Sequence, residues 1–180
     1  KKSREQYGYN VVLMLGDNIY PNGAVNNFKK KFELPYADLL KDGVRFFAAL
    51  GNHDVRQGLE AQLHYEKFNM SGRRYYSFTL GENLIEFFAL DSTLMHKQQL
   101  DWVEEKLKDS SAQWKVAFFH HPLYSSAKRH GSDMNLRRTL EPLFVRYQVN
   151  AVFSGHDHVY ERIKLQQGIQ YFVQGASGQL

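Results

Sequence analysis

Four apolar segments of the sequence each run into a cluster of polar side chains that could bind a metal ion. A single cluster is weak grounds for a site, because Gly-Asp and Gly-Asn pairs are common in turns. Four clusters rich in oxygen and nitrogen donors, each directly after a strand-like run, favour one shared site. The clusters are GDNIY at 16–20 after VVLML, GNHD at 51–54 after FFAAL, HHP at 120–122 after VAFF, and GHDH at 155–158 after AVFS.

Imidazole, carboxylate and amide side chains together suit zinc, manganese and iron ions. A carboxylate can bridge two such ions, and two ions about 3.5–4 Å apart can hold a phosphoryl group and lower the pKa of bound water. Glycine precedes three of the four donor groups, where it lets backbone and substrate approach closely. The pattern therefore predicts a two-metal hydrolase site.

The elements that must position these clusters follow from the hydrophobic pattern. Runs of β-branched and aromatic residues alternate with longer amphipathic segments. The segment KQQLDWVEEKLKD, for example, places Leu100, Val103 and Leu107 on one helical face. Pro35 separates two short helices, because its ring blocks a continuous one. Strands are predicted at 11–15, 44–50, 75–80, 84–90, 115–119, 150–153, 159–165 and 169–174, and helices at 24–33, 35–41, 57–68, 96–109 and 133–147.

Turn residues between neighbouring strands predict two hairpins, one at Gly81-Glu82-Asn83 and one at Gln167-Gly168. The alternation of the other strands with helices predicts a largely parallel arrangement. We expect an α/β sandwich in which two mixed β-sheets are flanked by α-helices (αββα). Because the carboxyl ends of strands form one rim in open α/β sheets, the four clusters are expected to converge there.

Length and composition are those of one globular domain, with 180 residues and 43% hydrophobic residues. The absence of cysteine excludes disulfides and thiolate metal sites. A net charge of +4 suits an anionic substrate, and no basic stripe with aromatic or glycine-rich modules indicates a nucleic-acid partner. The longest apolar runs have the length of strands, so no membrane span is expected.

In order and spacing, the four motifs resemble the calcineurin-like metallophosphoesterase superfamily, and within it the purple acid phosphatases. The family pattern is an Asp in D-x-G, then G-D-x-x-Y, G-N-H-[DE], V-x-x-H and G-H-x-H. This chain carries the last four as GDNIY, GNHD, AFFH at 117–120 and GHDH, with Ala117 in place of the valine. The tyrosine in G-D-x-x-Y separates the purple acid phosphatases from most of the superfamily.

The resemblance implies a metal centre of one ferric ion and one divalent ion, which is iron, zinc or manganese. Asp17 resembles the carboxylate that bridges the two ions. Tyr20 and His158 resemble ligands of the ferric ion. The ligands that the resemblance implies for the divalent ion are Asn52, His120 and His156.

Two histidines outside the ligand set resemble catalytic residues of the family. His53 matches a histidine that contacts the phosphate and protonates the leaving group, and His130 has the spacing of a second histidine that faces the substrate. Three further residues are candidates for orienting these side chains: Asp54 would support His53, and His121 and Asp157 would orient the ligand histidines next to them. Each has an alternative explanation: Asp54 as the cap of the next helix, His121 as a structural residue and Asp157 as a solvated side chain.

The resemblance implies hydrolysis of small phosphate esters, with monoesters favoured, by attack of a metal-bound hydroxide. One alternative is a phosphodiesterase of the same superfamily that acts on cyclic nucleotides or phospholipid headgroups. A second is an inactive relative that binds phosphate-containing ligands. Known members are commonly exported, so the resemblance implies a secreted or periplasmic protein, although the sequence shows no signal peptide.

The first family motif, D-x-G, has no counterpart ahead of GDNIY. Its Asp is a ligand of the ferric ion, and we expect a strand upstream of residue 1 to supply it. The sequence also stops at GASGQL, which reads as a cut within the structure. We therefore expect residues 1–180 to form a single catalytic domain that lacks its first strand and its C-terminal end.

Overall fold

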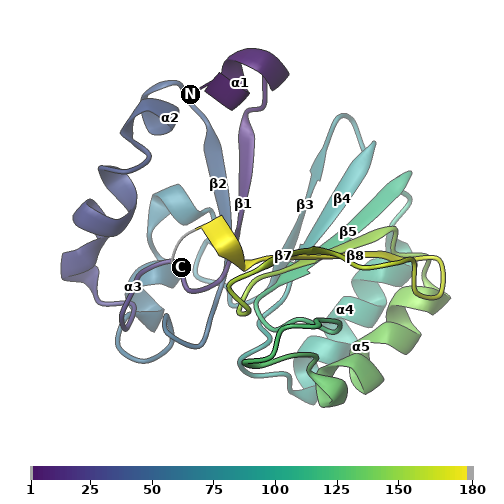
Figure 1. Ribbon diagram of the computed structural model, residues 1–180. Helices are drawn as coiled ribbons and strands as arrows, with labels where there is room; N and C mark the ends of the chain where they lie inside the picture. The colour runs from purple at the N-terminus through teal and green to yellow at the C-terminus, as the bar shows by residue number, and fades with distance from the viewer. Residues whose placement is uncertain (1, 178–180) are drawn as a thin grey trace.

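The apolar runs of the sequence form strands in two sheets that face each other (Figure 1). A computed structural model of the chain describes residues 2–177. In the first sheet, β1 (Val11–Leu15) pairs in parallel with β2 (Arg45–Ala49), and Leu13 lies opposite Phe47. Both strands coincide with predicted ones, because each is a continuous apolar run of strand length.

The second sheet has the strand order β3-β4-β5-β6-β8-β7 and is mixed. Its four inner strands run parallel, and β3 and β7 are antiparallel to their neighbours. Both predicted hairpins are confirmed, with positive φ angles at Glu82 and Asn83 in one turn and at Gln167 and Gly168 in the other. The strands are β3 (Tyr76–Leu80), β4 (Ile85–Ala89), β5 (Trp114–Phe119), β6 (Ala151–Ser154), β7 (Tyr160–Arg162) and β8 (Gln170–Gln174).

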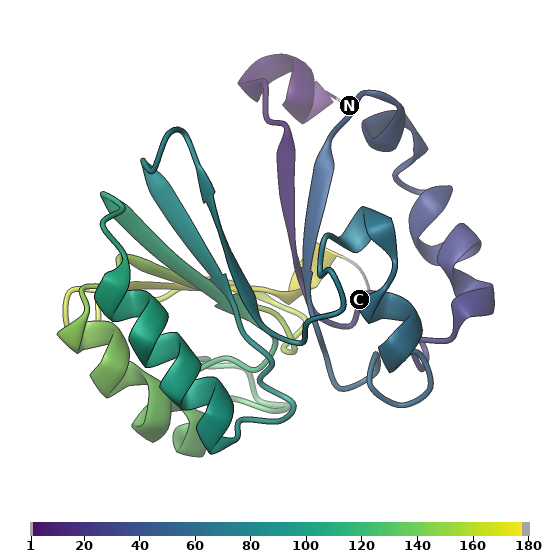
Figure 2. The same cartoon turned by 180° about the vertical axis from the view of Figure 1, so that it is seen from behind.

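Helices cover the outer face of each sheet (Figures 1 and 2). The long helices α4 (Lys97–Asp109) and α5 (Met134–Arg146) lie side by side on the second sheet. No helix formed by residues 2–177 has the length and apolar character that a membrane crossing needs. The shorter helices are α1 (Lys2–Tyr7), α2 (Ala37–Lys41), α3 (Leu59–Leu63), 3-10 turns at Val25–Asn27, Glu66–Phe68 and Gly175–Ser177, and a π-helical turn at Lys29–Glu33.

The hydrophobic core consists of two clusters, and the inner strands contribute to both because their side chains alternate between faces. In β5, Phe118 belongs to the cluster that includes Phe46 of the first sheet, whereas Phe119 packs with Leu107 and Phe144 beneath α4 and α5. The predicted α/β sandwich is thus confirmed.

Two of the predicted helices, at 24–33 and 57–68, are not continuous α-helices in the structure. The segment 24–33 forms a 3-10 turn and a π-helical turn, in which Leu34 donates to the carbonyl of Lys29 at 2.9 Å. The ring of Pro35 would clash with the carbonyl four residues earlier in a continuing α-helix, and the wider turn avoids that clash. The segment 57–68 leaves the α-helix after Leu63, which lets the ring of Tyr65 pack at 4.8 Å from that of Phe28.

Candidate metal centre

The carboxyl ends of β1, β5 and β6 meet at one rim of the sandwich. The Nδ1–H of His120, directly after β5, donates to the carbonyl of Leu15 at the end of β1 at 2.9 Å. The N–H of Gly155, after β6, donates to the carbonyl of His120 at 3.0 Å. These bonds bring the segments that follow the three strands together, as the sequence predicts.

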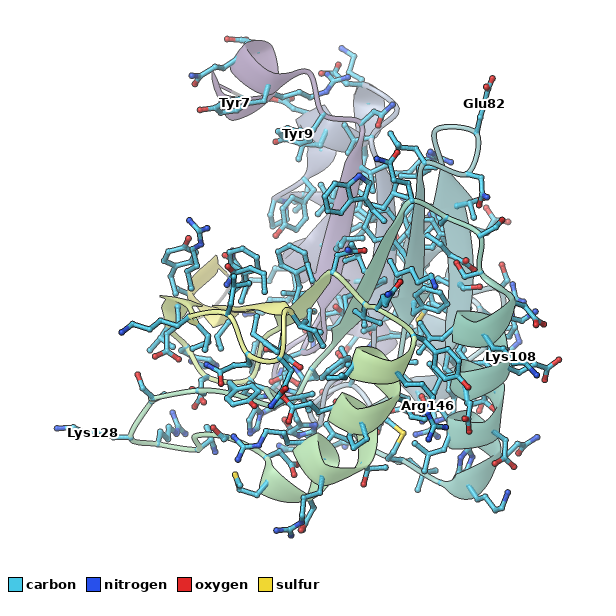
Figure 3. All side chains as sticks on the ribbon, turned by 90° about the vertical axis from the view of Figure 1, so that its right-hand side faces the viewer. Tyr7, Tyr9, Glu82, Lys108, Lys128 and Arg146 are labelled. Atoms are coloured by element: carbon cyan, nitrogen blue, oxygen red, sulfur yellow. The ribbon has the colours of Figure 1, made fainter. Side chains whose placement is uncertain are left out.

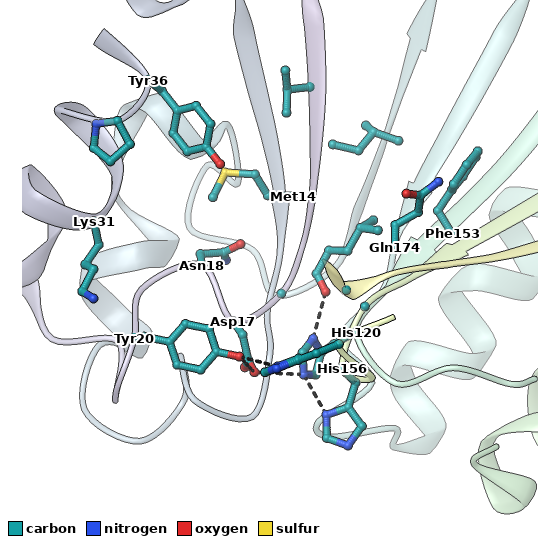
Figure 4. A pocket seen from close by; sticks show the side chains of 18 of the residues that line it. Met14, Asp17, Asn18, Tyr20, Lys31, Tyr36, His120, Phe153, His156 and Gln174 are labelled. Atoms are coloured by element: carbon teal, nitrogen blue, oxygen red, sulfur yellow. Dashed lines mark hydrogen bonds and ion pairs between the residues drawn. The ribbon is translucent and has the colours of Figure 1, made fainter. Parts of the chain in front are cut away.

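Oxygen and nitrogen atoms that could bind a metal ion converge around His120, which Figure 4 shows beside Asp17 and His156. Its Nε2 lies 3.0 Å from Oδ1 of Asn52 and 3.1 Å from Nδ1 of His156. Because the Nδ1–H is committed to a carbonyl, Nε2 is the ring nitrogen of His120 left to bind a cation. Oδ1 of Asn52 and Nδ1 of His156 lie within reach of the same cation. The group therefore fits a metal ion, and the bond to Leu15 fixes the ring as outer hydrogen bonds of metal sites do.

Asp17 lies between this group and a second pair of donors. Its Oδ2 is 3.4 Å from Nε2 of His120 and accepts from the Tyr20 hydroxyl at 2.9 Å. The Tyr20 hydroxyl is also 3.2 Å from Nε2 of His158. One carboxylate thus touches both donor groups, which is the placement that a bridging ligand requires.

The environment sets the charges of Asp17 and Tyr20. Burial would raise the pKa of Asp17, but hydrogen bonding and charge from His120, with the N–H of His53 at 2.9 Å, hold that pKa well below its usual range. Burial, together with the charge and hydrogen bond of Asp17, raises the pKa of Tyr20. The phenol therefore keeps its proton in the metal-free chain, and a cation that bound the phenolate would have to displace that proton.

His121 and His156 are held as neutral imidazoles. Burial, reinforced by the neighbouring His120, lowers the pKa of His121 to about 4 and that of His156 to about 3. Nitrogen atoms of His120, His121 and His156 lie within 4.8 Å of one another. Neutral imidazoles are the form that binds metal ions, so His121 and His156 keep their nitrogen donors available at neutral pH.

Asp54 is fully buried and joins the two loops that carry Asp17 and Asn52. Its Oδ2 accepts from the N–H groups of Asn18 at 3.0 Å and Gly51 at 2.9 Å. Its Oδ1 accepts from the N–H of Ile19 at 3.1 Å and from the amide of Gln62 at 2.8 Å. Burial raises the pKa of Asp54, and these four donors oppose the rise. The carboxylate thus holds the metal loops together, whereas the sequence suggested a contact with the His53 ring or a helix cap.

The two predicted catalytic histidines contact different members of the donor groups, His53 at Tyr20 and His130 at His156. The Nδ1–H of His53 donates to the carbonyl of Pro21 at 2.5 Å, and its ring centroid is 4.7 Å from that of Tyr20. The ring centroid of His130 lies 4.2 Å from that of His156. The structure therefore brings both histidines to the rim where the predicted ligands gather.

Asp157 and His121 each contact a serine side chain outside the ligand set. The Asp157 carboxylate accepts from Ser125 and Gly131 in the loop that carries His130. The Nδ1 of His121 lies 2.9 Å from Oγ of Ser92, which also accepts from the His121 N–H. The sequence did not assign Ser92 to the site, although the polar pair Asp91-Ser92 directly follows strand β4 (Ile85–Ala89) and Leu90, much as the other clusters follow their strands.

A cavity of about 680 Å³ adjoins the donor groups and extends along β1 (Figure 4). At its polar end the cavity is lined by Asp17, Tyr20, His120, His156 and His158. The wall along the strand is apolar, with Val12, Met14 and Phe153 among its residues, and Lys30 and Lys31 supply positive charge. The cavity could hold an anionic group beside an extended apolar segment.

Replacing Gly51 with alanine is expected to weaken metal binding by about 10- to 100-fold, the usual effect of disturbing an outer contact of a ligand. A Cβ at this position would overlap the backbone nitrogen and Oδ1 of Asp17, so the carboxylate would have to move. The measurement is the metal affinity of the purified variant by competition with a chelator.

Gly43→Ala is the control for that measurement, because Gly43 has φ +74° and no atom lies within 4 Å of an added Cβ. This variant should lose about 1 kcal/mol of stability through backbone strain and keep its metal affinity. If the Gly51 and Gly43 variants had equal metal affinity, the close contact between Gly51 and Asp17 would not be needed for metal binding.

The sequence profile of the family described as "Calcineurin-like phosphoesterase" matches residues 1–160 of the chain. Purple acid phosphatase 4 of Arabidopsis thaliana is 29% identical over 201 residues, which cover 95% of this chain and 59% of that protein. Tartrate-resistant acid phosphatase type 5 of Oryctolagus cuniculus is 27% identical, with 96% of this chain and 62% of that protein covered. The chain thus spans about 60% of the length of these relatives.

A solved structure of similar fold is described as "GAP50 the anchor in the inner membrane complex of Plasmodium". It aligns with a TM-score of 0.77 at 21% identity, over 96% of this chain and 63% of that one. At this identity the likeness concerns the fold alone.

Proposed function

The chain belongs to the calcineurin-like phosphoesterase family, and on this premise we propose that it is the main part of a two-metal phosphatase that hydrolyses phosphate monoesters. The observation that carries the proposal is the Asp17 carboxylate, which touches the Asn52–His120–His156 group on one side and the Tyr20–His158 pair on the other. Such a carboxylate between two sets of neutral donors suits a pair of cations better than one.

The residues divide into two ligand sets that share Asp17. We assign Tyr20 and His158 to a ferric ion, because a phenolate is a hard ligand that favours the trivalent state. Asn52, His120 and His156 suit a divalent ion, which we take as iron, zinc or manganese. When bound, the two ions supply Lewis acidity toward a phosphoryl oxygen and lower the pKa of a water molecule.

Two histidines of the chain contact the phosphate, and one of them donates a proton to the leaving group. The Nδ1–H of His53 is held by the carbonyl of Pro21, so its Nε2 is the nitrogen left to face the substrate. In its protonated form this nitrogen donates a hydrogen bond to the phosphate and a proton to the departing alkoxide. His130, on the far side of His156, contacts the same phosphate and stabilises the charge that develops on it.

The cavity along β1 is where we place the Asp of the missing D-x-G motif. Within residues 2–177, β1 pairs only with β2, and all five of its residues are half-buried although the run is wholly apolar. An extended upstream segment in this cavity would cover that surface and bring a carboxylate to Tyr20. We expect the full-length protein to bind iron more tightly than residues 1–180 alone, and equal iron affinity would refute this placement.

The substrate class is tested with p-nitrophenyl phosphate and bis(p-nitrophenyl) phosphate on full-length protein loaded with iron and zinc. We expect kcat/KM for the monoester to exceed that for the diester by at least about tenfold. The opposite preference would support the phosphodiesterase alternative. Two bound ions with no turnover of either ester would support a ligand-binding relative without activity.

We also propose, from the family alone, that the full-length protein is exported from the cytoplasm. Small phosphate esters are the partners that suit its site.

A further inference from the structure

The strongest unassigned feature is the way in which the loop that carries His130 is attached. This His130 loop, residues 125–131, extends from the body of the molecule, with Lys128 at its outer end (Figure 3). Lys128, Arg129 and His130 are all exposed. Something other than hydrophobic packing must therefore hold His130 against His156.

One buried oxygen atom binds both ends of the loop. Asp157 is 1% exposed, and its Oδ2 accepts from the hydroxyl of Ser125 at 2.7 Å and from the N–H of Gly131 at 3.1 Å. Its Oδ1 is buried and has no hydrogen-bond partner among the described residues. A buried carboxylate is costly unless its bonds are strong, so the two bonds to the loop are the ones that stabilise it there.

The other bonds of the loop are of different kinds. Ser125 and Ser132 exchange hydrogen bonds of 2.9 and 3.2 Å, which close the base of the loop without fixing its position. Ser126 donates to Glu161 in β7, at an exposed position where competition with water weakens such bonds. Asp157 is thus the buried attachment between the loop and the segment of His156 and His158.

We propose that Asp157 is a positioning residue, which fixes the His130 loop so that His130 faces the phosphate beside His156. The inference rests on the role proposed above for His130. It differs from the role suggested by the sequence, in which Asp157 orients a neighbouring ligand histidine directly.

The first test is independent of activity and uses trypsin, which cleaves after Lys128 and Arg129. Asp157→Asn keeps the size of the side chain but makes a weaker acceptor, and Ser125→Ala removes a donor from the loop side alone. We expect each change, in the full-length protein, to speed cleavage within the loop by about fivefold relative to cleavage in α4. Ser111→Ala is the control, because Ser111 is exposed and bonds to Asn83 far from the loop.

The second test is a double-mutant cycle on kcat/KM for p-nitrophenyl phosphate. Asp157→Asn should lower kcat/KM by about tenfold with two metal ions still bound, and by less than about twofold in a His130→Ala background.

Unchanged trypsin cleavage in both the Asp157→Asn and Ser125→Ala variants would overturn the proposal. So would a loss of metal, or a kinetic loss of equal size in both backgrounds. If the parent protein has no turnover, the proposed function fails, and the trypsin comparison still decides the role of Asp157.

Discussion

Replacing Asp17 with alanine is expected to lower kcat/KM for phosphate monoesters by at least about 1,000-fold, which corresponds to about 4 kcal/mol. Among residues 2–177, Asp17 is the one carboxylate that touches both donor groups, so its removal should weaken both metal sites together. The N–H of His53, which donates to the same carboxylate, would also lose its partner. The measurement is steady-state kinetics of the full-length protein with p-nitrophenyl phosphate.

Asp101→Ala is the control for the Asp17 variant. Asp101 lies on the exposed side of α4, paired with Lys97, and takes no part in the site. Its replacement should leave kcat/KM within about twofold of the parent value, since exposed ion pairs contribute little. An Asp17 variant with the activity of the Asp101 variant would refute the role of Asp17 as a bridging ligand.

Asp54→Asn is expected to lower the free energy of unfolding by about 3 kcal/mol and to impair metal binding with it. Each oxygen of Asp54 accepts two N–H donors, so an amide NH₂ would face two donors in either orientation. The loops that carry Asp17 and Asn52 would then separate. Urea unfolding of the metal-free protein measures the change.

Asp101→Asn serves as the matched control for the stability measurement, because it makes the same chemical change at an exposed carboxylate. It should alter the free energy of unfolding by less than about 0.5 kcal/mol. If the two asparagine variants were equally stable, the hydrogen bonds of Asp54 would not be holding the loops together.

Strand β1 was predictable because it is a continuous apolar run bounded by turn residues, VVLML before Gly16-Asp17. Strand β7 was predicted too long, at 159–165, because its residues Tyr160–Arg162 carry little apolar pattern. The long helices α4 and α5 were predictable from their amphipathic pattern. The conformations of the segments 24–33 and 57–68 were not predictable, because they depend on packing against residues far away in the sequence. Tyr65 and Phe68 lie outside the α-helix and join an aromatic cluster with Phe28, a contact that no local pattern indicates.

The convergence of the candidate site was predictable because its residues follow strands whose carboxyl ends share one rim. The partners of Asp54 and Asp157 were not predictable, because they lie far along the chain or in the backbone. Asp54 binds N–H groups of Asn18 and Ile19, 36 and 35 residues earlier, and backbone donors leave no mark on residue type. Asp157 binds Ser125, 32 residues earlier, through a loop whose path the sequence does not specify.

The central claim is that the rim holds two metal ions that share Asp17, and the most direct measurement is the metal content of the full-length protein. Elemental analysis should find two ions per chain, one of them iron, and both should be depleted in Asp17→Ala. Two ions without iron would contradict the role of Tyr20 as a ligand of ferric iron. A protein that binds no metal, or that keeps both ions without Asp17, would contradict the account as a whole.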